Sequence, residues 1–190
     1  MVLDASVVIN LNATGHSAAI LDALPNRVLV VDEVRQEVER DSRNGRKDAD
    51  IFAGLVASSQ VEVVELGEAG MQQFTNLVSG PATETLDDGE AATITYALEQ
   101  DLTVLIDERK ANRICAERYT GLETACTVDV LAHESIDSLL GRETLAEAVF
   151  NALYYGRMRV PNQHLGWVVD LIGAERAGQC NSLPRSARST

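Results

Sequence analysis

The amino-acid sequence predicts an α/β fold, a sandwich with a mainly parallel sheet, followed by a helical extension. Short apolar runs alternate with helical patterns up to about residue 140, which is typical of strand–helix–strand units. The run 27–31 is apolar almost throughout, as strands buried on both faces of a parallel sheet are. After Gly141 the pattern becomes purely helical.

The elements follow in order along the chain. Predicted strands begin within 1–9 and lie over 27–31, 61–66, 103–107 and 123–127. Predicted helices lie over 17–24, 33–41, 48–58, 69–78, 90–100, 109–119 and 128–139. Two segments interrupt these elements: a polar loop over 42–47 and a break at 80–83. The loop carries Arg43, Arg46 and Lys47, which could contact substrate phosphates or could be solvated charges.

The C-terminal part carries apolar residues at helical spacing, such as Leu145, Val149 and Ala152, and a further apolar helix begins at Pro161. We therefore expect a domain over 1–140, a helical extension over 141–178 and a flexible tail over 179–190. The two helices of the extension are too short to be stable alone in water. They should pack on the domain or across a dimer.

Charge and cysteine content restrict the possible functions. The 190 residues carry a net charge of −13, and residues 141–190 contain six Arg against four acids, so the acidity lies in 1–140. Such a chain does not coat nucleic acid by bulk electrostatics, although a nuclease whose metal offsets the charge of its site is compatible with it. The odd number of cysteines without CxxC spacing predicts buried thiols in a reducing cytoplasm. No signal peptide and no run of ~18 apolar residues is present, so we expect a cytoplasmic protein without membrane spans.

Four carboxylates are placed where strands end or where the following helices begin. Asp4 follows the first apolar run and Asp107 follows 103–106, while Glu37 and Glu90 lie in helices after a strand and after a turn. In an open parallel sheet the carboxyl ends of the strands share the edge at which ligands bind. Acids gathered there need a cation, and oxygen-rich clusters suit Mg²⁺ or Mn²⁺. The sequence therefore predicts a metal-dependent enzyme that acts on phosphates.

Each acid also has a structural alternative. Asp4 could be a turn or capping residue, although a buried acid without a partner would be costly. Glu90 could close a capping box with Asp87, a role compatible with metal binding. Glu37 lies nearer than Glu33 to the apolar stripe of its helix, so we favour Glu37 and keep Glu33 as the alternative.

Other candidate residues are less specific. Ser6 could position substrate or a water molecule, or simply bond to the local backbone. Arg109 could contact substrate phosphates, as could Lys110 and Arg113, or these residues could form a solvated helix face. The three histidines lack zinc spacing. We expect Tyr154 and Tyr155 to serve in packing or oligomer contacts.

Four segments together resemble the motifs of PIN-domain ribonucleases, the family of the VapC-type toxins. Residues 2–11 resemble the opening motif, Val34-x-x-Glu37 the second, 86–91 the Gly-Glu-Ala variant of the third, and 104–111 the fourth, as found in a stand-alone branch. Each motif is short, but four in order over residues 1–140 are specific. The extension after residue 140 is longer than in compact toxin-type members.

The resemblance implies a Rossmann-like three-layer sandwich, frequent homodimerisation and Mg²⁺- or Mn²⁺-dependent hydrolysis of RNA. It assigns the metal to Asp4, Glu90 and Asp107, with Glu37 as a further catalytic carboxylate. The partner could be an antitoxin protein if the chain is the toxin of a toxin–antitoxin pair. Two alternatives are a catalytically silent regulatory module and a haloacid-dehalogenase-type phosphatase. The phosphatase would require a second Asp where Ser6 stands.

Overall fold

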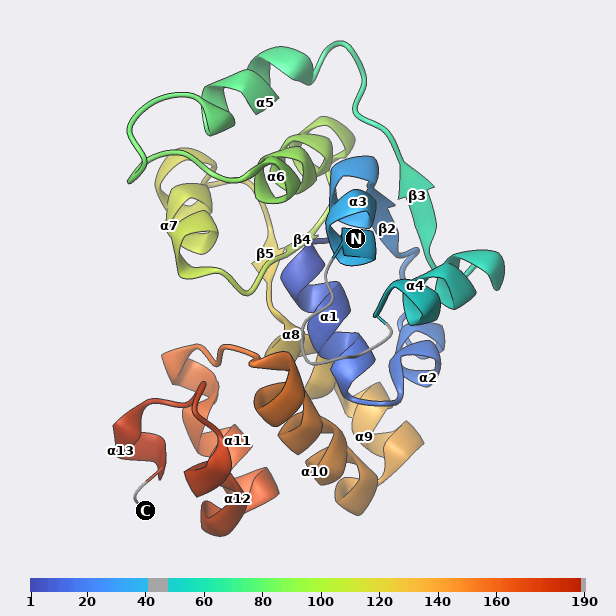
Figure 1. Ribbon diagram of the computed structural model, residues 1–190, viewed down its shortest axis with the longest axis vertical. Coiled ribbons are helices and arrows are strands. Elements are labelled where there is room, and N and C mark those ends of the chain that lie inside the picture. The colour runs from blue at the N-terminus through green and yellow to red at the C-terminus, as the bar shows by residue number, and fades with distance from the viewer. Residues whose placement is uncertain (41–47, 189–190) are drawn as a thin grey trace. The chain divides into compact units, whose positions relative to one another are not determined.

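A parallel sheet of five short strands forms the centre of the α/β region (Figure 1). The computed structural model describes residues 1–40 and 48–188, so the predicted loop over 42–47 lies outside the described residues. The strands are β1 Val2–Leu3, β2 Leu29–Val31, β3 Glu62–Val64, β4 Val104–Leu105 and β5 Thr124–Ala125. Every pairing between them is parallel. The predicted α/β fold with a parallel sheet and a helical extension is confirmed.

The strand order, β3-β2-β1-β4-β5, places β1 at the centre of the sheet. The chain adds β2 and β3 on one side of β1 and then returns to add β4 and β5 on the other. Leu3 of β1 pairs with Leu105 of β4, so these neighbouring strands end at nearly the same level. The carboxyl ends of β1 and β4 therefore flank the point where the strand order reverses, at which open α/β sheets bind ligands.

Seven helices lie in the first two thirds of the described chain. They are α1 Ala5–Ala13, α2 Ser17–Asp22, α3 Asp32–Arg40, α4 Asp48–Ala57, α5 Met71–Val78, α6 Asp88–Gln100 and α7 Arg109–Arg118. Only α1 was not expected, because we placed residues 1–9 in a strand region. Residues 7–14 are all buried, so this helix shows no alternation of polar and apolar faces that would reveal its period in the sequence.

Helix α6 is the best-buried helix of this region. It packs against β1, β2 and β4 and against the helices α3 and α5, and α3 lies directly beside it (Figure 1). Ala91, Ile94 and Ala97 are fully buried. This helix therefore holds its N-terminal turn in a fixed place relative to the strand ends.

The segment 128–139 was predicted as one helix, and this prediction is wrong. The structure has two helices, α8 Thr127–Leu131 and α9 Glu134–Leu140. His133 begins the second helix as its N-cap, where its Nδ1 accepts a hydrogen bond from the backbone N–H of Ser135 (3.2 Å). This local bond replaces the continuation of α8.

The C-terminal region is helical, as predicted. Its elements are α10 Arg142–Asn151, the π-helix η2 Ala152–Gly156, the 3-10 helix η3 Asn162–His164, α11 Leu165–Ile172, α12 Ala174–Gln179 and α13 Arg185–Arg188. Gly156 lies against the last turns of α1: a Cβ built there would be 2.6 Å from Asn10 Oδ1 and 3.2 Å from Ala13 Cβ. The extension thus packs against the end of α1.

By internal contact the chain divides into two compact units, residues 1–8 with 26–126 and residues 9–25 with 127–190. The expected domain limits at residues 140 and 178 stay predictions. In the expected tail, Cys180 and Leu183 are buried.

All three cysteines, Cys115, Cys126 and Cys180, are buried thiols, as predicted. Among the described residues, no helix combines the length and the apolar character needed to cross a bilayer.

Candidate active site

Asp4 directly follows β1 and is buried, with 3% of its surface exposed. Its backbone N–H donates to the carbonyl of Leu105 on β4 (3.0 Å), which ties it to the neighbouring strand. Its carboxylate oxygen Oδ2 accepts hydrogen bonds from the Ser6 hydroxyl (2.7 Å) and the Ser6 backbone N–H (3.2 Å). Ser6 therefore orients the Asp4 carboxylate at the start of α1.

Asp107 follows the adjacent strand β4 and is also buried, with 7% exposed. The side-chain amide of Asn112 donates to the carbonyls of Ile106 (2.8 Å) and Glu108 (3.1 Å), the residues on either side of Asp107. Asn112 thus fixes the backbone that carries this acid. Sequence inspection did not single out Asn112, since a side chain five residues away along a helix carries no recognisable signal.

The first turn of α6 presents a third acid. The Asp87 carboxylate accepts from the backbone N–H of Glu90 (2.8 Å), and the Glu90 carboxylate accepts from the backbone N–H of Asp87 (3.3 Å). This is the predicted capping box. It holds Glu90 at the N-terminus of α6 with only 5% of its surface exposed.

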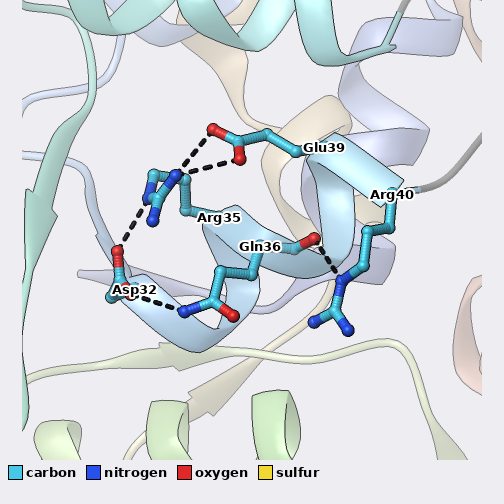
Figure 2. Close-up of polar contacts among 5 residues, drawn as sticks. All are labelled: Asp32, Arg35, Gln36, Glu39 and Arg40. Atoms are coloured by element: carbon cyan, nitrogen blue, oxygen red, sulfur yellow. Dashed lines mark hydrogen bonds and ion pairs between the residues drawn. The ribbon is translucent and has the colours of Figure 1, made fainter.

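Glu37 lies on helix α3 and its carboxylate reaches the first turn of α6, which carries Glu90. Val34 and Val38 form the buried stripe of α3. On the opposite side, a polar network joins the residues of Figure 2: Arg35 donates to Asp32 (2.7 Å) and to Glu39 (2.8 Å), Gln36 donates to Asp32 (2.7 Å), and Arg40 donates to the Gln36 carbonyl (2.8 Å).

These bonds to Arg35, and then to Gln36, hold the pKa of Asp32 below its usual value. Asp32 therefore belongs to the solvent face of α3. At 100° per residue, Glu37 lies on the flank between the polar network and the buried stripe. Its carboxylate oxygen comes next to Gly89 in the first turn of α6.

The electrostatics of Asp4 show which acids are brought together. Burial, with the charges of Glu37 and Asp87 added to it and the hydrogen bonds from Ser6 opposing it, raises the pKa of Asp4 from 3.8 to about 7. A buried carboxyl close to two other carboxylates favours its protonated form. The fold thus gathers Asp4, Glu37 and Asp87 at one place.

Glu90 belongs to the same cluster. Burial, followed by the charges of Asp87 and Asp4, raises the pKa of Glu90 from 4.5 to about 8. The backbone N–H of Asp87 and the positive charge of Lys110 oppose the rise. Lys110 in the first turn of α7 is therefore a cation whose charge acts on Glu90, and both Lys110 and Arg109 are exposed to solvent.

Glu33, the alternative to Glu37, is half-buried on α3, and its Oε2 has no hydrogen-bond partner within the described ranges. Asp87 was expected to be a capping or solvated turn residue. Asp87 is indeed the N-cap, but its charge also acts on both Asp4 and Glu90.

The donor set fits a hydrated divalent cation. Carboxylate oxygens are the ligands that Mg²⁺ and Mn²⁺ prefer. In the part of the chain that the structure describes, no three of these acids have oxygens that all lie within 4.8 Å of one another. Mg²⁺ commonly keeps several water molecules and binds one or two carboxylates directly, which suits this spacing. A cation would also offset the repulsion that raises the pKa values of Asp4 and Glu90.

Fold and site together define an α/β protein with buried acids at the switch point of a parallel sheet. The chain belongs to the PIN-domain family, since a family model described as a PIN domain matches residues 1–174. PIN domains are in general nucleases and typically use divalent metal ions. No curated protein and no solved structure matches the chain, so the relation to VapC-type toxins stays a prediction.

Proposed function

We propose that this PIN-domain protein is a Mg²⁺- or Mn²⁺-dependent endoribonuclease that hydrolyses phosphodiester bonds in RNA. The observation that carries the proposal is the burial of Asp4, Glu90 and Asp107 at the ends of two adjacent strands and at the first turn of α6. The pKa of Asp4, raised to about 7 by burial and by the charges of Glu37 and Asp87, agrees with it. Perturbed acids grouped at a ligand-binding edge are typical of active sites.

In this proposal Asp4, Glu90 and Asp107 would hold the metal, directly or through its water molecules, and Ser6 keeps the Asp4 carboxylate in position. A divalent ion bound there lowers the pKa of water and stabilises negative charge on the phosphoryl and leaving oxygens. Glu37 orients the attacking water or accepts its proton. The charge of Lys110, on the Glu90 side of the cluster, attracts a phosphate of the substrate.

Purified protein should cleave RNA with Mg²⁺ or Mn²⁺ and stop when EDTA is added. Asp4→Asn should abolish cleavage while circular dichroism stays unchanged, and Asp170→Asn, on the exposed side of α11, should cleave like the parent. Equal cleavage by the parent and Asp4→Asn would sink the proposal. A folded parent that binds metal but cuts no RNA would favour the silent regulatory module.

The biological role can be tested separately. We propose that the protein is a cytoplasmic homodimer and the toxin of a pair whose antitoxin is a separate protein. The three buried thiols support the reducing compartment. Production of the parent should then arrest growth of the host, and production of Asp4→Asn should not. If the host grows normally with equal amounts of the parent and the variant, the toxin role is refuted and the protein would be an RNA-processing enzyme.

A further inference from the structure

Gly89 occupies a buried position in the first turn of α6, between the two members of the capping box. Its φ is not among the positive values found in the described chain, so the backbone does not require glycine there. A glycine inside a helix is destabilising relative to alanine, because it loses more conformational freedom on folding. The residue therefore has to be explained by what surrounds it.

A methyl group at this position would meet the carboxylate of Glu37. A Cβ built on Gly89 would lie 2.9 Å from Glu37 Oε2, a separation that real Cβ atoms do not tolerate. The same Cβ would lie 3.4 Å from Val34 Cγ2 and 3.7 Å from Asp87 Oδ1, which are tight and ordinary contacts. The overlap is thus confined to the end of one flexible side chain.

We propose that Gly89 is a positioning residue, whose missing side chain admits the Glu37 carboxylate to the N-terminal turn of α6. There the carboxylate comes close enough to Asp4 for its charge to act on it. The positive end of the helix dipole favours a negative group at this place. The role in catalysis rests on the proposed nuclease function, whereas the steric coupling of Gly89 and Glu37 does not.

Replacing Gly89 by alanine should therefore lower activity without lowering the stability of the fold. The helix gains propensity, and Glu37 swings away because moving its carboxylate is easier than moving α6, which packs against three strands. Gly89→Ala should melt in EDTA at the same temperature as the parent or higher. The rise in melting temperature caused by Mn²⁺ should shrink, and RNA cleavage should fall at least tenfold.

Gly54→Ala provides the matched control. Gly54 lies on the exposed face of α4, and nothing lies within 4 Å of a Cβ built there. This variant should gain the same helix propensity while the Mn²⁺ response and cleavage stay at the parent level. A loss of cleavage in Gly54→Ala equal to that in Gly89→Ala would overturn the proposal.

A double-mutant cycle tests whether Gly89 acts through Glu37. In a Glu37→Ala background, Gly89→Ala should cause no further loss of cleavage or of the Mn²⁺ response, because the displaced group is already absent. A further tenfold loss in that background would show that Gly89 acts on something else.

The same cycle in EDTA does not depend on nuclease activity. The melting shifts of Gly89→Ala and Glu37→Ala should not add up in the double variant, since the two groups touch. Additive shifts would refute the steric coupling. Non-additive shifts in a protein that cuts no RNA would refute only the nuclease function.

Discussion

Asp4→Asn should stabilise the metal-free protein at neutral and alkaline pH while it removes activity. In the folded chain, burial and the charges of Glu37 and Asp87 raise the pKa of Asp4 from 3.8 to about 7. Between these two values the folded protein binds more protons at this group than the unfolded chain does. Its stability therefore falls as the pH rises through that window.

The size of the effect follows from the shift. About three pH units at roughly 1.36 kcal/mol each give an upper limit of roughly 4 kcal/mol above pH 7. For a chain of this length, each 1 kcal/mol changes the melting temperature by about 2–4 °C. The substituted asparagine side chain keeps an oxygen for the hydrogen bonds from Ser6 but carries no charge, and its neutrality also lets Glu90 ionise more easily.

Circular dichroism can monitor thermal unfolding in EDTA between pH 5 and pH 9 and so measure the pH dependence of the stability. The parent should lose stability across the range, and Asp4→Asn should lose much less and melt several degrees higher at pH 8. Mn²⁺ should reverse the order, because it stabilises the parent by binding its native state. Asp170→Asn, an exposed acid of α11, should follow the parent. Parallel curves for the parent and Asp4→Asn would refute the assignment of a buried, repelled carboxyl.

Three further predictions concern other parts of the molecule. Glu37→Gln should lower RNA cleavage at least 100-fold and Glu33→Gln only a few-fold, because Glu37 lies about 80° and Glu33 about 120° from the centre of the α3 stripe of Val34 and Val38. The reverse result in a cleavage assay would assign the role to Glu33. Truncation at Gly141 removes α10, which packs against α9, and should cause aggregation visible by light scattering; a stable, soluble product would make the extension independent. The half-exposed rings of Tyr154 and Tyr155 are expected at a dimer contact, so replacing both by Ser should shift sedimentation toward the monomer, and an unchanged profile would place that contact elsewhere.

The sequence by itself determined the elements whose signals are local. Apolar runs bounded by turn residues located all five strands to within a few residues. Asp4 and Asp107 could be recognised because a strand buried on both faces rarely ends in an acid without a reason. The capping box of Asp87 and Glu90 and the flank position of Glu37 follow from helix geometry alone.

Other features depend on contacts between segments that are distant in the sequence. The strand order decides that β1 and β4 are neighbours, and this brings Asp4 beside the strand that carries Asp107. The helix α1 stayed hidden because all its sides are buried, and the break at His133 depends on one local hydrogen bond.

The relation of Gly89 to Glu37 appears only when α3 packs on α6. The effect of Lys110 on Glu90 likewise requires the first turns of α7 and α6 to approach each other. The sequence specifies which acids the site contains, because strand ends and helix caps are set by neighbouring residues. Tertiary packing sets their separation and burial, and these raise the pKa values of Asp4 and Glu90.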